Sequence, residues 1–142
     1  MSGPSPDPAP QTGRSQAALE RLAQLGVRRL RVVQQMTATD CGAACLSMVL
    51  GMYGCEVSLD KMRNAMGVER NGVSALGIMR AARSYGLRGR GVMLEDVDEL
   101  ALVERGTILH WEFNHFVVFD HVDRKGQIVL LDPALGRRRV AA

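Results

Sequence analysis

Residues 35–54 read QMTATDCGAACLSMVLGMYG, and this stretch decides the fold. Apolar side chains such as Leu46 and Val49 recur after Cys41 at helical spacing, and further apolar residues stand beside them. Gly54 follows the last of them, as glycine commonly does where a helix ends. The pattern predicts a helix from about Cys41 to Tyr53 with a broad apolar face, around which the other elements pack.

The segments on either side predict helices before strands. Serines at positions 58 and 74 are expected to cap two helices, and the last third of the chain is rich in β-branched and aromatic residues. Helices followed by antiparallel strands define an α+β domain. The predicted helices are 15–25, 41–53, 58–66, 74–85 and 95–102; the predicted strands are 107–111, 116–122 and 127–131; 87–93 is a candidate strand and 30–33 a brief extended segment.

The chain has 142 residues, which fits one domain, and 46% of them are hydrophobic and 23% charged. Four of the five prolines lie in the first ten positions. We therefore expect residues 1–14 to be a disordered tail and residues 15–142 to form the domain. The longest apolar run falls far short of the roughly 20 residues of a membrane span, and the first residues do not have the pattern of a secretion signal.

Composition argues against two further classes of protein. The net charge is only +3 and aromatic residues make up 4%, too few for stacking on bases, so nucleic-acid binding is disfavoured. The three cysteines are Cys41, Cys45 and Cys55. An odd number does not make a disulfide framework, and no second Cys/His pair has the spacing of a zinc finger. We expect a reducing compartment and no metal.

Cys41 is the candidate nucleophile because it stands in the first turn of the predicted helix, where the pair Thr39-Asp40 before it supplies a capping residue. Unpaired backbone N–H groups and the helix dipole favour a thiolate at that position. Gly42 would let a substrate backbone come close. The alternative is that Cys41 is a small buried residue of the core, and this is our interpretation of Cys45 and Cys55.

A nucleophilic cysteine needs a base, and the register of the last strands helps to find it. A turn with an even number of residues within 123–126 would set Val122 opposite Gln127 and Val117 opposite Asp132. Side chains alternate along a strand, so His115 shares the face of Val117 and becomes a diagonal neighbour of Asp132.

This geometry favours His115 among the three histidines of the chain. His121 lies on the same face but six residues further along, and His110 lies on another strand. The sequence therefore predicts His115 as the base and Asp132 as the carboxylate that orients it.

Three motifs together resemble a known family. Residues 35–54 resemble the catalytic-cysteine motif of the bacteriocin-processing cysteine peptidases, which are the N-terminal domains of peptidase-containing ABC transporters. Residues 110–118 (HWEFNHFVV) resemble the histidine motif of that family, and residues 132–136 (DPALG) resemble its aspartate motif. The resemblance implies a papain-like fold and removal of a leader peptide after a Gly-Gly or Gly-Ala pair.

The resemblance also implies a role for each residue of the site. Cys41 is the nucleophile, His115 the base and Asp132 the orienting carboxylate. Gln35 is implied as the oxyanion donor, with Gln34 as its competitor, because papain-like peptidases use a glutamine amide a few residues before the cysteine.

The expected partners are a precursor peptide with a helical leader and the transmembrane and ATPase domains of an exporter. The chain shows no transmembrane helices and no P-loop, so we expect an isolated peptidase domain, excised or natural. It would act in the cytoplasm, at the inner face of the membrane when part of a transporter. No cofactor is expected on the chain itself, since ATP would be used only by the nucleotide-binding domain.

Two other functions stay open at this stage. The first is a leader-binding module that does not cut, and the second is a different Cys-His-Asp enzyme such as an acyl or amine transferase.

We expect the leader to dock as an amphipathic helix near the predicted helix 74–85, while an extended segment carries the glycines to Cys41. Adaptable methionine side chains favour varied apolar partners. The candidate residues for leader binding are Met48, Met52, Leu76 and Met79.

Overall fold

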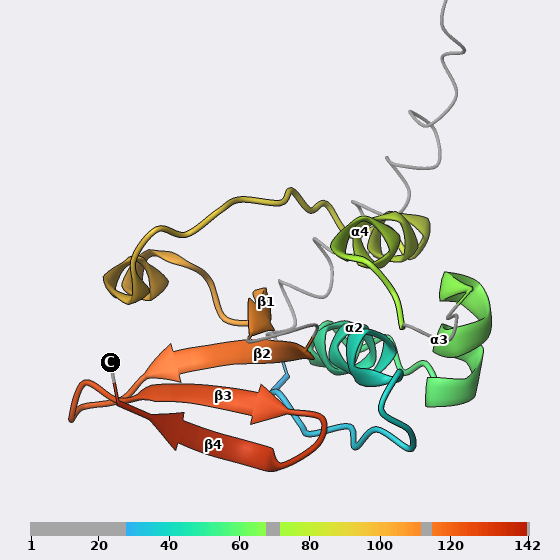
Figure 1. Cartoon of the computed structure of the whole chain (residues 1–142). Helices are drawn as coiled ribbons and strands as arrows, with labels where there is room; N and C mark the ends of the chain where they lie inside the picture. Colours follow the sequence, from blue (N-terminus) through green and yellow to red (C-terminus); the bar gives the residue numbers. More distant parts are fainter. Residues whose placement is uncertain (1–27, 68–71, 112–114, 142) are drawn as a thin grey trace, which may run out of the picture.

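The structure is a computed structural model of the chain, and it describes residues 28–67, 72–111 and 115–141 (Figure 1). The predicted tail 1–14 and helix 15–25 lie outside these residues. The helical elements are α2 (Cys41–Met52), α3 (Leu59–Met66), α4 (Ala75–Ser84) and the 3-10 helix η1 (Val97–Leu102). The strands are β1 (Ile108–Trp111), β2 (His115–Val122), β3 (Ile128–Asp132) and β4 (Gly136–Val140). The predicted α+β class is confirmed.

The two predicted serine caps are present. Ser58 Oγ accepts a hydrogen bond from the N–H of Lys61 at 3.3 Å, and Ser74 Oγ accepts one from the N–H of Gly77 at 3.1 Å. Each bond satisfies one backbone N–H group of a first helical turn. The predicted helix 95–102 is a shorter 3-10 helix, η1.

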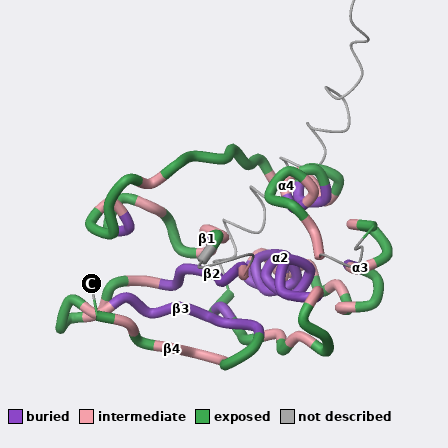
Figure 2. The backbone as a smooth tube through the Cα atoms, in the orientation of Figure 1, coloured by how far each residue is buried: buried purple, intermediate pink, exposed green. Residues whose placement is uncertain are grey.

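The strands form one antiparallel sheet in the order β1-β2-β3-β4. Figure 1 shows α2 between this sheet and the helices α3 and α4, and α2 contacts all three. Phe116, Val118 and Leu131 share a core cluster with Cys41 and other residues of α2. The other face of the sheet packs on a second cluster around η1. In Figure 2, α2 and the central strands are the most buried elements.

The candidate strand at 87–93 is absent from the structure. Residues 87–93 form no strand, and the side chains at their end point to solvent, with Met93 91% exposed. Residues 30–33, predicted as a brief extended segment, belong to no strand of the sheet, and Leu30 is buried. No strand of the described chain pairs with residues 87–93.

Strand β4 was not predicted, because three consecutive arginines look like a solvated charged run. In the structure β4 pairs with β3 along its whole length. Two arginines of β4 form ion pairs with buried carboxylates, Arg137 with Asp120 and Arg138 with Asp132. Carboxylates of β2 and β3 thus neutralise these positive charges of β4.

The predicted register between β2 and β3 is wrong near the turn and agrees at the far end. Val122 pairs with Ile128, so five residues separate the paired positions and not an even number. An irregularity between Phe119 and His121 absorbs one residue of β2, as a β-bulge does. Beyond it Val118 pairs with Leu131, and continuing by one residue sets Val117 opposite Asp132, as predicted.

The bulge residue Asp120 is a buried carboxylate that ties four segments together. Arg137 Nη1 of β4 lies 2.6 Å from one oxygen of Asp120, and Arg105 Nε lies 2.7 Å from the other. Arg137 also donates to the carbonyl oxygen of Leu30 at 3.3 Å. Burial by itself raises the pKa of Asp120, but the hydrogen bond from Arg137, together with His121 and Arg105, outweighs it and lowers this pKa below its usual value.

Asp120→Asn should therefore destabilise the fold by about 2 kcal/mol at pH 7, because the partly buried Arg137 and the exposed Arg105 lose their buried charged partner. A group with a lowered pKa in the folded state stabilises the protein above its unfolded pKa, and this stabilisation is lost as the pH falls through the folded value. The difference between wild type and variant should thus begin to shrink below about pH 4, the ordinary pKa of an aspartate, and vanish only below the lower pKa of the folded state. Urea unfolding at pH 7 and pH 3 measures it, with the exposed Glu56→Gln as control; an equal difference at both pH values would contradict the assignment.

Candidate active site

Cys41 is buried and is the first residue of α2. Asp40 occupies the N-cap position, as predicted, but its side chain makes no capping hydrogen bond to α2. The first turn of the helix is thus not engaged by the carboxylate before it. The field of the helix dipole at this turn favours a negative charge on sulfur or on a substrate oxygen.

His115 and Asp132 are hydrogen-bonded, as the sequence predicted. His115 Nε2 lies 2.8 Å from Asp132 Oδ1. A carboxylate only accepts hydrogen bonds, so Nε2 carries the hydrogen and the neutral ring has its lone pair on Nδ1. The nitrogen that can take a proton from a thiol is therefore Nδ1.

Asp132 is nearly inaccessible to solvent, and three donors hold it. Oδ1 also accepts the N–H of Ala134 at 2.8 Å, and Oδ2 accepts Arg138 Nη1 at 3.1 Å. Burial alone raises the pKa of Asp132, but the hydrogen bonds from His115, Ala134 and Arg138 outweigh it and lower this pKa below its usual value. Asp132 stays ionised and fixes both the tautomer and the orientation of the imidazole.

Gln35 is connected to the aspartate end of the site through the backbone. Its N–H donates to the carbonyl oxygen of Pro133 at 2.9 Å, directly after Asp132. Its side-chain Nε2 donates to the carbonyl oxygen of Thr37 at 3.1 Å, which uses one of the two amide hydrogens. Gln34, the competitor, is exposed.

Cys45 shows how close the candidate residues lie. Burial raises the pKa of its thiol well above the usual value, and electrostatic interactions with Cys41 and Asp132 raise it further. Cys45 therefore stays a neutral thiol, unsuited to attack a carbonyl, and lies within the electric field of both candidate residues.

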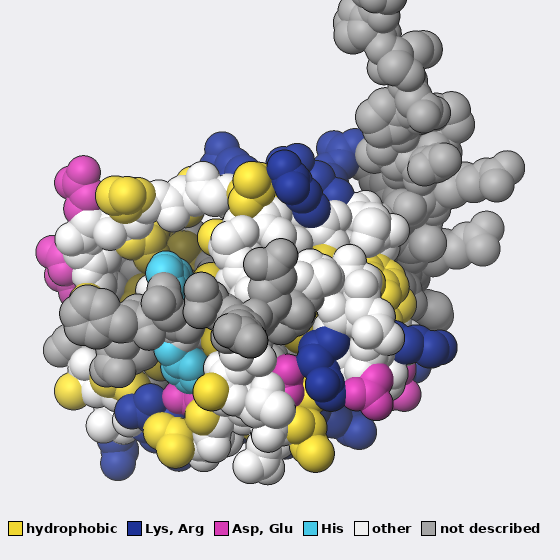
Figure 3. Space-filling model, turned by 45° about the vertical axis from the view of Figure 1, so that its right-hand side comes forward, with side chains coloured by type: hydrophobic (Ala, Val, Ile, Leu, Met, Phe, Trp, Pro, Cys, Tyr) yellow, Lys and Arg dark blue, Asp and Glu magenta, His cyan; other side chains and the backbone are white. Residues whose placement is uncertain are grey.

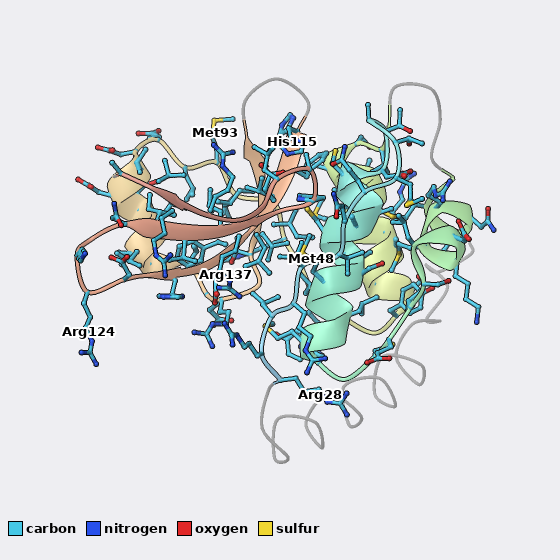
Figure 4. All side chains as sticks on the ribbon, turned by 90° about the horizontal axis from the view of Figure 1, so that it is seen from below. Arg28, Met48, Met93, His115, Arg124 and Arg137 are labelled. Atoms are coloured by element: carbon cyan, nitrogen blue, oxygen red, sulfur yellow. The ribbon has the colours of Figure 1, made fainter. Side chains whose placement is uncertain are left out.

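All four predicted residues thus lie at one end of the domain. In Figure 4, His115 lies toward the side where α2 begins, and Arg28 lies toward the other end, where its N–H donates to the carbonyl oxygen of Met52. Figure 3 shows histidine side chains at the surface of the face that it draws. The side chain of His115 is 25% exposed.

The other two histidines have different surroundings. His110 stacks on Phe116, with ring centroids 4.8 Å apart. His121 lies beside the Asp120 cluster, at the turn end of β2, with Nδ1 3.4 Å from Asp120 Oδ1. Neither His110 nor His121 is in a position to hydrogen-bond to Asp132.

The predicted role of Gly42 in substrate approach is not supported. A Cβ added at Gly42 would lie 2.4 Å from Val73 Cγ1, and one added at Gly77 would lie 2.5 Å from Val73 Cγ2. Val73 therefore fills the space on both glycines and holds the start of α4 against the start of α2. Gly42 serves helix packing.

Two of the candidate leader-binding residues are not at the surface. Met48 and Met52 are buried in the core, so their sulfur and methyl groups pack against the sheet and offer no docking surface. Met52 also borders a cavity at the end of α2 far from Cys41. On α4, Leu76 is 48% exposed and Met79 is half-buried, and these two remain candidates.

Sequence reasoning missed two residues that contact the site. Arg138 reaches Asp132 from β4, and recognising β4 as a strand would have placed both residues on one sheet face. Asp40 was interpreted as a simple cap. Among the described residues there is no group of three or more His, Cys, Asp or Glu side chains that could hold a metal ion.

Comparison with known proteins identifies the class of this site. The model of the Peptidase C39 family matches residues 29–142. The chain belongs to this family. Its members are cysteine peptidases, and the chain is accordingly a cysteine peptidase with a papain-like α+β fold.

Several relatives of the chain are named secretion/processing ATP-binding proteins. The probable microcin-H47 secretion/processing ATP-binding protein MchF of Escherichia coli is 40% identical over 111 residues, which are 78% of this chain and 16% of that protein. The colicin V secretion/processing ATP-binding protein CvaB of Escherichia coli is 38% identical over 114 residues, 80% and 16% of the two chains. The chain thus spans about one sixth of the length of these relatives. None of its described helices is long and apolar enough to span a bilayer.

Two solved structures resemble the fold. A double-glycine-motif protease of an AMS/PCAT transporter, solved with the leader peptide, superimposes with a TM-score of 0.74 at 39% identity, covering 82% of each chain. The peptidase domain of Streptococcus ComA superimposes with a TM-score of 0.66 at 22% identity, covering 80% of this chain and 87% of that one, and supports the fold.

His115→Ala should lower kcat at least about 10⁴-fold, because the thiol loses the base to which it transfers its proton. Asp132→Asn should lower it less, since an amide oxygen can still accept from Nε2. The matched controls His110→Ala and His121→Ala should keep most activity. Initial rates of peptide cleavage measure all four variants; an inactive His121→Ala beside an active His115→Ala would contradict the assignment.

Proposed function

We propose that this chain removes the leader of a bacteriocin-type precursor peptide by cutting after a Gly-Gly or Gly-Ala pair. The observation that carries the proposal is the 2.8 Å hydrogen bond between His115 Nε2 and Asp132 Oδ1, at the end of the sheet where Cys41 begins α2. Residues with these three roles suffice for acyl transfer to a thiol.

The proposed reaction has two steps. His115 Nδ1 takes the proton of the Cys41 thiol as sulfur attacks the glycine carbonyl carbon, and His115 then returns the proton to the leaving amine. This forms a thioester between Cys41 and the leader. Water, deprotonated by the same nitrogen, hydrolyses the thioester and regenerates the thiol. The Gln35 side chain and the N–H of Cys41 are the proposed donors to the oxyanion.

Glycine before the cut fits the tight packing at the nucleophile. Cys41 is buried, with 5% of its surface exposed, so we infer a narrow approach to its sulfur that a substrate Cβ would block. A site without side-chain pockets needs affinity from elsewhere on the peptide. The related protease solved with a leader peptide supports a leader-binding surface.

We propose that the leader docks as an amphipathic helix at α4, through Leu76 and Met79. Val73, lodged between Gly42 and Gly77, connects α4 directly to the first turn of α2, so a peptide on α4 is held at a fixed distance from Cys41. As the relatives are exporters, the proposed partners include transmembrane and ATPase domains, and the proposed location is the cytoplasmic face of the membrane.

A non-cleaving leader-binding module is the alternative, and the Cys41→Ala variant separates the two. It should abolish cleavage of a precursor with a double-glycine leader, by at least about 10⁴-fold, and leave leader binding nearly intact. Cys45→Ala should still cut, with some loss of stability, because a buried thiol is removed from the core. Mass spectrometry of the products tests both. Cleavage by Cys41→Ala at the wild-type rate would contradict the mechanism, and wild type that binds but never cuts would favour the alternative.

Leu76→Asp should raise KM for the precursor about tenfold or more, with little change in kcat, because an apolar contact on α4 is lost and the chemistry is untouched. Leu102→Asp is the matched control, since Leu102 is 84% exposed on η1. Steady-state kinetics with the precursor measures both. Equal effects of the two variants would argue against docking at α4.

A further inference from the structure

Asp40 is a fully buried carboxylate directly before the nucleophile, with 0% of its surface exposed. Its side chain turns away from α2 and back along the chain. Oδ2 accepts the N–H of Met36 at 3.1 Å and the N–H of Thr37 at 2.9 Å. Its own N–H donates to the carbonyl oxygen of Thr37 at 3.2 Å, so the segment 36–40 is closed into a tight loop.

The same loop holds the side chain of Gln35. The carbonyl oxygen of Thr37, which accepts from the N–H of Asp40, also accepts from Gln35 Nε2 at 3.1 Å. Both backbone polar groups of Thr37 are therefore held: its N–H by the Asp40 carboxylate, and its carbonyl oxygen by the Asp40 N–H and by Gln35 Nε2. The position of the Gln35 amide depends on the backbone of Thr37.

Arg63 of α3 supplies a positive charge that offsets the cost of burying the Asp40 carboxylate. Its Nε lies 3.4 Å from Asp40 Oδ1, and its Nη2 lies 2.6 Å from Asp60 Oδ1. An ionised acceptor forms stronger hydrogen bonds to backbone N–H groups than a neutral one does. Asp40 Oδ1 faces Arg63, and Asp40 Oδ2 accepts the hydrogen bonds from the N–H groups of Met36 and Thr37.

We propose that Asp40 is a positioning residue for oxyanion stabilisation: it holds the 36–37 backbone so that the Gln35 amide stays beside the carbonyl under attack. This inference rests on the proposed function, because it assumes that Gln35 acts as an oxyanion donor. Asp40 touches neither substrate nor sulfur in this role, and it acts through Gln35. The role differs from that of Asp132, which orients His115.

A double-mutant cycle with Gln35 tests the proposal. Gln35→Ala should lower kcat about a hundredfold or more, the usual effect of losing one oxyanion donor. Asp40→Ala should lower kcat by at least about tenfold but no more than Gln35→Ala does, and KM should change little. In the double variant kcat should lie within about twofold of Gln35→Ala alone, since residues acting in series do not add. Losses that multiply, or a raised KM at unchanged kcat, would overturn it.

Conservative and control variants separate positioning from general stability. Asp40→Asn keeps an oxygen that accepts both N–H groups, so it should retain more kcat than Asp40→Ala; equal damage would overturn the acceptor role. Asp60 is the other carboxylate that pairs with Arg63, and its side chain is 83% exposed. The control variant Asp60→Asn should therefore keep the wild-type kcat. If thermal melts show that Asp40→Ala is unfolded, Asp40→Ser, whose hydroxyl is too short to reach both N–H groups, takes its place.

Hydrogen exchange tests the loop without any substrate. The N–H groups of Met36 and Thr37 should exchange slowly in wild type and much faster in Asp40→Ala, while α4 keeps its protection. Unchanged exchange at both positions would overturn the proposal even if the precursor is not cut. Wild type that fails to cut the precursor would instead overturn the proposed function, so the two failures are distinguishable.

Discussion

The burial of helix α2 is the constraint on which the rest of the structure depends. Eleven of its twelve residues are buried, between the sheet on one side and α3 and α4 on the other. A helix enclosed in this way cannot rotate or slide without exposing apolar surface or opening cavities. Its first residue, Cys41, is therefore held at one place relative to the sheet. The same burial keeps Cys45, one turn further on, as a neutral thiol.

The sheet places the other half of the site by its register. His115 begins β2 and Asp132 ends β3, so one pairing register decides whether the two side chains meet. The bulge around Asp120 shifts that register by one residue, and Arg105 and Arg137 hold Asp120 in place. The irregularity at Asp120 thus separates the register near the turn from the register that brings His115 and Asp132 together.

The sequence was sufficient for the elements with strong local signals and for the pairing of His115 with Asp132. Serine caps, glycine stops and three ordered motifs are local patterns, and local patterns survive folding. The predicted pairing of His115 with Asp132 is correct although the turn has an odd number of residues, because the bulge in β2 compensates for the extra residue of the turn. Features decided by distant contacts were not predictable: β4 forms because carboxylates of other strands receive its arginines, and Asp40 turns from α2 to the 36–37 backbone.

The central claim is that Cys41, His115, Asp132 and Gln35 act on one glycine carbonyl. A crystal structure with a leader peptide ending in a Gly-Gly aldehyde tests it most directly, because the thiol adds across the aldehyde and gives a stable hemithioacetal. The account predicts a bond from Cys41 Sγ to the aldehyde carbon, with the new oxygen within hydrogen-bond distance of Gln35 Nε2 and His115 Nε2 still on Asp132 Oδ1. A bond at Cys45 or Cys55, or an oxygen facing away from Gln35, would contradict it.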